Sequence, residues 1–521
     1  MTRQKSDDRI VPEGRRKSSP IGVSRGGKAV TVEEDVVQPK LPFATAETRR
    51  EIRRPAGLAP VVSTTGRPNT GPKANNKPGL ATHASIETVI ECLEPAFRKV
   101  AANRGAPGPD GQTVANVAKN LRNVLKTLGR QLADGTYQPG PIRRVDIPKA
   151  SGGTRGLGIP NVSDRMVQEA VRMVLEPLYE PTFHRNSHGF RPNRSCHTAI
   201  AQAQKYVQEG HEWLVDIDLE KFFDRVNHQR LMARLAARVG DKRLLVVIGR
   251  MLKAAVVMPE GVKVSTDEGV PQGGPLSPLL SNIVLDELDQ ELERRGHRFV
   301  RYADDCNIYV RSEKAGLRVM ASVTEFIDGR LRLTVNAAKS AVARPDTRHF
   351  LGYRLLPKPS GAEILLSERS RKRLIEKIRE LTPRNWGGSL EACIARINTY
   401  FGGWFGHFRV CTPDAERDLK VADARARRRM RAIILRHWKR KVTIANRLIR
   451  LGRKRKTVWQ TVYGGRKSTW ALSHAGVVDR ALHNAYFAER GFDTLLQRFQ
   501  QLWATIAAPA QLSLWPGDSR S

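Results

Sequence analysis

Three acidic residues have the chemistry and the placement to bind metal ions. Asp304 and Asp305 are adjacent within FVRYADDCNIYV (299–310), and Asp218 directly follows the apolar run WLVDI. Adjacent carboxylates repel one another unless a cation neutralises them. Three hard oxygen ligands suit two Mg²⁺ ions about 4 Å apart, which align a hydroxyl nucleophile with a phosphate. A plain acidic turn, whose Asp side chains bond the local backbone, stays open on these residues alone.

Strand patterns are expected to position these acids. The residues on either side of Asp304 and Asp305 are rich in β-branched and aromatic types, which predicts a hairpin with a tight turn. The run at 213–217 predicts a strand that ends at Asp218. A strand ending in one acid beside a hairpin tipped by two would bring three carboxylates to one point. Phosphoryl chemistry there depends on positioning and charge, so it needs no Cys or His nucleophile.

The charge of the chain points to a polyanionic partner. The sequence has 89 Lys and Arg against 52 Asp and Glu, a net charge of +37, and its pI is near 10.6. Such a surplus favours nucleic acid, with a membrane surface as the alternative. No apolar stretch reaches the ~18 residues of a spanning helix. The five Cys are dispersed and no secretory signal begins the chain, so we expect a reducing, cytoplasmic location.

Composition divides the 521 residues into several regions. Residues 1–79 are rich in Pro, Gly, Ser and basic residues with a single aromatic, which predicts a disordered basic tail. The mixed patterns of 80–365 predict strands and helices together, whereas 366–450 predicts long basic helices. Residues 451–521 stay basic, and their interleaved aromatic residues are compatible with RNA stacking.

A second group of side chains is suited to phosphate binding. The segment RRVDIPKASGGTRGLGIP (143–160) predicts a strand, a glycine-rich turn and a strand, with Lys149 and Arg155 near the tip. Both side chains supply charge-assisted donors for a triphosphate. A basic surface hairpin without that role is the alternative. Two glycines follow Gln272 and would let the backbone approach a template base closely.

The motifs together resemble one family. YADD (302–305), preceded by GVPQGGPLSPLLSNIVLDELD (269–289), resembles the reverse transcriptases encoded by group II introns, the intron maturases. The resemblance covers about residues 86–495. It implies an α+β fold, a right-hand polymerase with fingers and palm followed by an all-α basic thumb, the maturase domain. It also implies an RNA-directed DNA polymerase that copies intron RNA and assists splicing.

The resemblance assigns roles to individual residues. It implies that Asp218, Asp304 and Asp305 are catalytic and hold two Mg²⁺ ions. Phe223 would lie beneath the sugar of the incoming dNTP and exclude a 2′-hydroxyl, although a core Phe is the alternative. The residues expected to bind the nucleotide, its triphosphate or its base pair are Lys149, Arg155, Ile159, Phe223, Gln272 and Lys339.

The basic helices of the thumb would bind RNA. The stretch ADARARRRMRAIILRHWKRK concentrates positive charge where a duplex backbone would pass. The expected RNA-binding residues are Arg425, Arg428, Arg429, Arg436, Lys439 and Arg440. Expected partners are group II intron RNA, an RNA template with a DNA primer, and target DNA; whether a homodimer forms stays open. No Cys follows Cys411, so we expect the form without a C-terminal endonuclease domain.

Two other functions are alternatives. One is an RNA-binding splicing factor with an inactive polymerase, which the presence of all three acids and Phe223 argues against. The other is a reverse transcriptase of a different element, such as a retron, a diversity-generating element or a defence system. The long PQGGPLSPLLSN run and the basic helices downstream favour the intron family.

Overall fold

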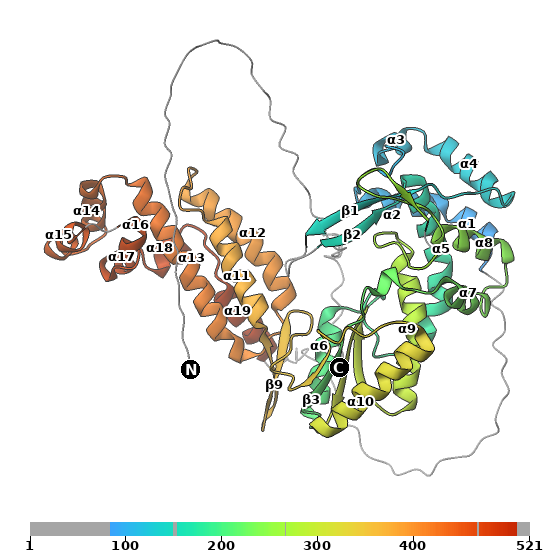
Figure 1. Ribbon diagram of the computed structural model, residues 1–521. Helices are drawn as coiled ribbons and strands as arrows, with labels where there is room; N and C mark the ends of the chain where they lie inside the picture. Colours follow the sequence, from blue (N-terminus) through green and yellow to red (C-terminus); the bar gives the residue numbers. More distant parts are fainter. Residues whose placement is uncertain (1–83, 149–153, 266, 466–467, 508–521) are drawn as a thin grey trace, which may run out of the picture. The chain divides into compact units, whose positions relative to one another are not determined.

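The computed structural model describes residues 84–148, 154–265, 267–465 and 468–507. The predicted basic tail (1–79) and Lys149 lie outside these residues. All the described residues belong to one compact unit. Their first elements are five helices and a hairpin (Figure 1), and the helices are α1 (Ile86–Glu91), α2 (Leu93–Ala102), α3 (Val114–Lys119), α4 (Leu121–Ala133) and α5 (Val162–Tyr179).

The predicted basic hairpin is present and belongs to a small sheet. Strands β1 (Ile142–Pro148) and β2 (Thr154–Ile159) pair antiparallel. Two short strands, β4 (Val256–Val257) and β5 (Lys263–Val264), extend the sheet in the order β2-β1-β4-β5. The β1–β4 pair is parallel. This sheet therefore ties the hairpin to a segment of the chain more than a hundred residues downstream.

A second four-stranded sheet carries the acids and has the order β6-β7-β3-β8. The expected strand is β3 (Trp213–Ile217), and the expected hairpin is β6 (Arg298–Tyr302) with β7 (Asp305–Val310). Strand β8 (Ala341–Ala343) completes it. All neighbouring strands pair antiparallel. The strand predictions around both acidic segments are confirmed.

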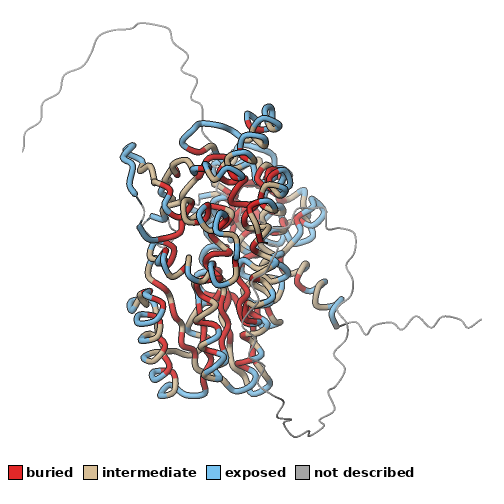
Figure 2. The backbone as a smooth tube through the Cα atoms, turned by 90° about the vertical axis from the view of Figure 1, so that its right-hand side faces the viewer, coloured by how far each residue is buried: buried red, intermediate tan, exposed pale blue. Residues whose placement is uncertain are grey.

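The acid-bearing sheet has a hydrophobic core on each face. Successive side chains of a strand point to opposite faces. On β3, Val215 and Ile217 join one core and Leu214 joins the other; on β7, Ile308 and Tyr309 divide in the same way. Figure 2 shows buried stretches concentrated along the central strands. Because both faces are covered, the ends of these strands are held rigidly.

Helices and short turns surround the sheet. The helices are α6 (Cys196–Gln208), α7 (His228–Ala236), α8 (Lys242–Leu252), α9 (Ser277–Arg294) and α10 (Glu313–Phe326). The 3₁₀ turns η1 (Glu180–Thr182) and η2 (Phe222–Asp224) precede α6 and α7, and the π-helical turn η3 (Ile327–Leu331) follows α10. The first core packs α1–α5 and α7–α10 against the sheet, whereas the second packs α6 against its other face.

The second core continues into the C-terminal helices. A hairpin of β9 (Tyr353–Lys358) and β10 (Gly361–Leu366) contacts α6 and leads into them. Buried residues of the sheet, the hairpin and these helices form one cluster. The remaining elements are α11 (Glu368–Leu381), α12 (Leu390–Phe408), η4 (Pro413–Ala415), α13 (Glu416–His437), α14 (Lys441–Arg450), α15 (Arg455–Tyr463), α16 (Thr469–Leu472), α17 (Gly476–Ala481), α18 (Asn484–Ala488) and α19 (Leu495–Ala507).

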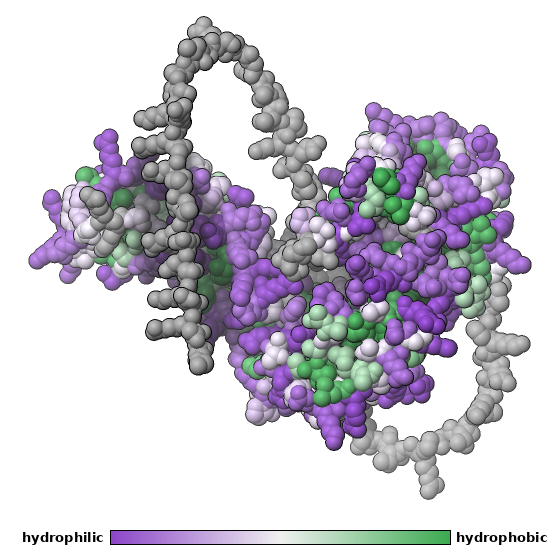
Figure 3. Space-filling model, in the orientation of Figure 1, coloured by the Kyte–Doolittle hydropathy of each residue, from purple (hydrophilic) through white to green (hydrophobic). Residues whose placement is uncertain are grey.

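The visible surface agrees with a highly charged chain. The face in Figure 3 is mostly hydrophilic, with separate apolar patches. Within the described ranges, no helix has both the length and the apolar character needed to cross a membrane.

Candidate active site

A strained two-residue turn presents the paired acids. Tyr302 and Asp305 are the last paired residues of the β6–β7 hairpin, so Ala303 and Asp304 form its turn. Ala303 has φ 58°, in the left-handed region. Short hairpin turns need such a backbone, but alanine adopts it at a cost because of its Cβ. The turn therefore depends on contacts from the surrounding protein.

A buried arginine supplies those contacts. Arg301 and Asp289 are both fully buried, and two guanidinium nitrogens of Arg301 donate to the Asp289 carboxylate at 2.7 and 2.5 Å. The same side chain donates to the Ala303 carbonyl at 2.8 Å and to Asn282 Oδ1 at 3.0 Å. It also donates to Ser187 Oγ at 2.7 Å. Arg301 thereby joins helix α9 to the acidic turn.

The segment before α6 packs directly against the acidic turn. Asn282 Nδ2 donates to the Gly189 carbonyl at 2.9 Å. A Cβ at Gly189 would lie 2.2 Å from the Ala303 backbone nitrogen, so only glycine fits this contact. Neither Arg301 nor Gly189 was among the sequence candidates. The sequence could have indicated Arg301, because it is a cation within a strand that is buried on both faces. A cation buried in this way needs a buried partner.

Strand β3 delivers Asp218 next to the turn. Ile217 pairs with Cys306, and continuing that antiparallel register by one residue sets Asp218 opposite Asp305. The Asp218 backbone N–H donates to Ser340 Oγ at 3.0 Å. Its carboxylate accepts from Lys339 Nζ at 3.2 Å. The structure thus brings together the three predicted acids and one of the predicted phosphate ligands.

Neighbouring acids contribute to raised pKa values at Asp304 and Asp305. Loss of hydration and the charges of Asp304, Asp216 and Asp218 raise the pKa of Asp305 to about 7. Asp305 is nevertheless exposed to solvent. Burial also raises the pKa of Asp304; the charge of Asp218 adds to this rise and Arg155 opposes it. Such mutual repulsion creates a site that favours a cation.

A fourth acid in the sheet has a separate partner. Burial raises the pKa of Asp216, but Arg348 opposes the rise and donates two hydrogen bonds to its carboxylate at 2.6 and 2.9 Å. Asp216 pairs with Asn307 across the sheet. Its charge is therefore balanced inside the protein, unlike that of Asp305.

The hairpin and the glycine turn meet beside the acids. Arg155 Nε donates to Gln272 Oε1 at 2.7 Å, and the Gly158 N–H donates to the Gln272 carbonyl at 2.6 Å. Gly273 has φ +114°, and a Cβ there would lie 2.6 Å from the Gly158 carbonyl. Ile159 is half-buried at the end of β2. Lys149 is outside the described residues, so the structure brings together only part of the predicted nucleotide set.

Phe223 lies in η2, which follows Asp218. Its exposed fraction is 7% and that of Phe222 is 2%, and the two rings meet edge to face at 5.2 Å. The Phe223 carbonyl accepts from the Val270 N–H at 2.6 Å. This bond fixes Phe223 against the segment that leads to Gln272. Its small exposed edge fits either a core position or the floor of a nucleotide site.

The predicted RNA-binding residues differ in exposure. Arg436, Lys439 and Arg440 are exposed, and Arg425 and Arg428 are half-buried. Arg429 is 5% exposed, and its guanidinium donates to the Thr382 carbonyl at 3.0 Å and to the Arg379 carbonyl at 3.1 Å. The structure gives Arg429 an internal role, the joining of α13 to the end of α11.

The acids do not form the tightest group of metal-ligand atoms. Among the described residues, only Cys196, His197 and His407 bring three such atoms within 4.8 Å of one another. Those side chains already have partners. His197 Nε2 is 2.7 Å from the His407 carbonyl, His407 Nε2 is 3.2 Å from the Leu351 carbonyl, and Cys196 Sγ is 3.6 Å from His407 Nδ1. They link α6 to α12.

The acid-bearing sheet lies in a region of the chain that matches a family of nucleotidyl-transfer enzymes. Residues 147–355 match the reverse transcriptases (RNA-dependent DNA polymerases), and residues 371–451 match the maturase-specific domain of group II introns. The chain belongs to the group II intron-encoded reverse transcriptases, and it is an RNA-directed DNA polymerase with a maturase domain. The family prediction is confirmed.

Curated relatives agree with this membership. Protein YkfC of Escherichia coli is 33% identical over 351 residues, 60% of this chain and 90% of YkfC. The putative COX1/OXI3 intron 2 protein of Saccharomyces cerevisiae is 37% identical, over 40% of this chain and 24% of that protein. The group II intron-encoded protein LtrA of Lactococcus lactis is 31% identical, over 49% of this chain and 53% of LtrA. The chain thus spans nearly all of YkfC but only about half of LtrA.

The contact behind the acidic turn predicts a loss of activity on substitution. We expect Gly189→Ala to slow primer extension on an RNA template by roughly 10²-fold, because the new Cβ displaces the turn and misplaces its carboxylates. The matched control is Gly329→Ala, where a Cβ meets nothing within 4 Å. Equal rates for the two variants would contradict the role of the Gly189 contact.

The raised pKa of Asp305 predicts a pH-dependent stability. Between pH ~4 and about 7, the folded state keeps a proton on Asp305 that the unfolded state releases. The contribution of Asp305 to the free energy of unfolding is therefore fully present below pH ~4 and is lost as pH rises through about 7. In EDTA, Asp305→Asn should therefore raise the melting temperature more at pH 8 than at pH 4. Asp328→Asn, at an exposed acid of η3, should give no such difference. A thermal melt of each variant at both pH values checks this.

Proposed function

We propose that the protein copies RNA into DNA by nucleotidyl transfer at Asp218, Asp304 and Asp305, with two Mg²⁺ ions and dNTP substrates. The convergence of three mutually repelling carboxylates at one end of the sheet carries this proposal. The donor set fits Mg²⁺, which prefers hard oxygen ligands. When bound, the ions would lower the pKa of the primer 3′-hydroxyl and stabilise the departing pyrophosphate.

Basic and polar side chains beside the acids would bind the nucleotide. We expect Arg155 and Lys339 to exchange their present partners, Gln272 and Asp218, for triphosphate oxygens. We expect Lys149 to join them. Gln272 would then be free to contact the primer–template pair, and Ile159 would pack on the base pair. These contacts hold the α-phosphate in line with the 3′-hydroxyl, the geometry that the transfer requires.

The arrangement of elements supports a right-hand polymerase. In this proposal the β1–β2 hairpin belongs to the fingers, the acid-bearing sheet is the palm, and α11–α14 form the thumb. The corresponding domains are residues 80–365 for fingers and palm, 366–450 for the thumb, and 451–521 for a basic extension. The two matched family regions, 147–355 and 371–451, are compatible with this division.

The maturase domain supports a second activity. We expect it to bind the intron RNA and stabilise its splicing-active fold, while the same chain uses an RNA template, a DNA primer and target DNA. Exposed Arg436, Lys439 and Arg440 supply charge for phosphate contacts. A reverse transcriptase of another element, such as a retron, is the second candidate. The maturase-specific match favours the intron.

Removing one acid tests the catalytic assignment. Asp304→Asn preserves the shape of the side chain but removes a charged ligand, so extension of a DNA primer on an RNA template with Mg²⁺ should fall at least about 10²-fold. Asp328→Asn should retain the wild-type rate. If the wild type binds group II intron RNA tightly but extends no primer, the protein is a splicing-only maturase.

A sugar-selection test addresses Phe223. We expect Phe223→Ala to raise ribonucleotide incorporation relative to deoxynucleotides by roughly 10-fold or more, because the ring no longer excludes a 2′-hydroxyl. Phe222→Ala is the matched control, since its ring is buried beside Phe223. That variant should lose stability and keep its sugar preference. If Phe223→Ala leaves the preference for deoxynucleotides unchanged, Phe223 is a core residue and does not select the sugar.

A further inference from the structure

Four guanidinium groups surround one aromatic ring in the C-terminal helices. Trp470 lies on α16, and its ring centre is 3.9 Å from Arg428, 4.9 Å from Arg384 and 5.4 Å from Arg425. Arg429 lies at 5.7 Å. An aromatic face attracts each cation through its quadrupole. Trp470 therefore holds several like charges together but does not neutralise them, whereas a carboxylate would neutralise them.

The charge of this cluster is not balanced by acids. Within the described part of the chain, Arg384, Arg425 and Arg428 form no ion pair, and the Nε atoms of Arg425 and Arg428 are buried without a hydrogen-bond partner. The nearby acid, Asp479, is already paired with Arg431 at 2.5 Å. Guanidinium groups held together in this state favour an anion with several oxygen acceptors.

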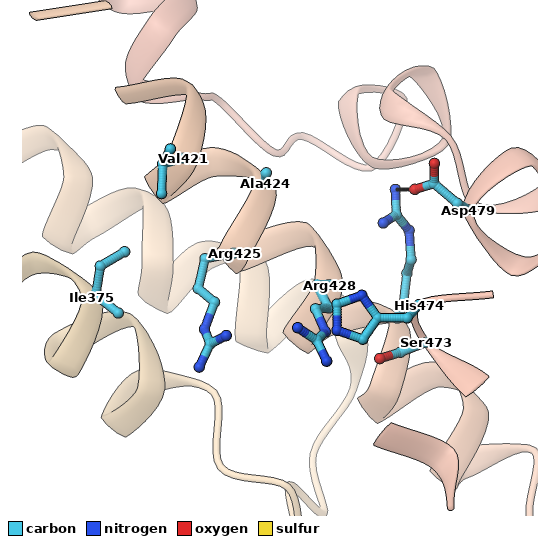
Figure 4. A pocket seen from close by; sticks show the side chains of 9 residues that line it. Ile375, Val421, Ala424, Arg425, Arg428, Ser473, His474 and Asp479 are labelled. Carbon is cyan, nitrogen blue, oxygen red and sulfur yellow. Dashed lines mark ion pairs between the residues drawn. The ribbon is translucent and has the colours of Figure 1, made fainter. Parts of the chain in front are cut away.

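The cluster opens into a cavity with two kinds of lining. Its volume is about 590 Å³. Figure 4 shows Arg425 and Arg428 extending in the same direction from α13, with the His474 ring beside Arg428. Ile375 and Val421 line the other end, and Val421 is 58% exposed. One end of the cavity therefore suits a phosphate, and the other suits a flat apolar group.

We propose that this cavity binds a single unpaired nucleotide of an RNA strand. The phosphate lies between Arg425 and Arg428, and the base packs against Ile375 and Val421. Regular duplex backbone needs only an exposed basic surface, whereas an open hollow of this size, with guanidinium groups at one end and apolar side chains at the other, accepts a nucleotide that has left the stack. The inference rests on the proposed function, because the cavity lies largely within the matched maturase region, which we expect to bind intron RNA.

Two RNA hairpins that differ by one bulged adenosine test this. For the full chain, we expect the bulged hairpin to bind roughly 10-fold more tightly than the perfect hairpin. Arg425→Gln with Arg428→Gln should reduce this preference to about 1. Arg436→Gln with Lys439→Gln removes the same charge from the exposed end of α13 and its neighbourhood. This control should weaken both hairpins alike and keep the preference.

A second variant protects the test against misfolding. Val421→Glu places a carboxylate at the mouth of the cavity on an exposed position, where substitution leaves the fold intact. It should abolish the preference for the bulge. Val442→Glu, at another exposed valine, should preserve it.

The outcomes separate this inference from the function on which it rests. Equal wild-type affinity for the two hairpins, or loss of the preference in the control variants, would overturn the nucleotide site and leave RNA binding intact. Failure of the wild type to bind either hairpin or intron RNA would instead remove the proposed maturase activity. A preference lost only in the cavity variants supports the site.

Discussion

The buried pair of Arg301 and Asp289 is the interaction on which the active-site geometry depends. Removing one member of such a pair costs about 3–5 kcal/mol, because the other charge is left buried without a partner. Here the pair also anchors a backbone carbonyl of the acidic turn, at Ala303. The turn has an unfavourable φ and carries repelling carboxylates, so it needs a rigid support that comes from outside the hairpin.

The site combines a rigid support with an electrostatic imbalance. The sheet is covered on both faces, and the ends of its strands hold Asp218 and Asp305 at opposite positions on adjacent strands. Asp216 has Arg348 as a partner, whereas Asp305 is left among acids. The clustered carboxylates therefore lower the stability of the fold and form a site that favours a cation. Such an arrangement is common where charge must be neutralised during the reaction.

The elements that local patterns determine are predictable from the sequence. The hairpin at 299–310, the strand before Asp218 and the basic hairpin near Arg155 follow from strand-type residues and turn chemistry, and all three are present. The role of Arg301 could not be predicted, because its partner, Asp289, lies on a helix that no strand pattern reveals. The burial of Arg429 could not be predicted either, since charge density along a helix does not show which cation turns inward toward Thr382.

The second hydrophobic core has a consequence for how such proteins can diversify. Residues of the acid-bearing sheet, such as Val300 and Tyr309, share one cluster with Phe401 and Leu435 of the C-terminal helices. Close-packed protein interiors tolerate few independent changes in volume. The polymerase and maturase regions are therefore poor modules for exchange: a chimaera that joins halves from two relatives would have mismatched side chains along the shared core. Divergence in one half is expected to be followed by compensating substitutions in the other.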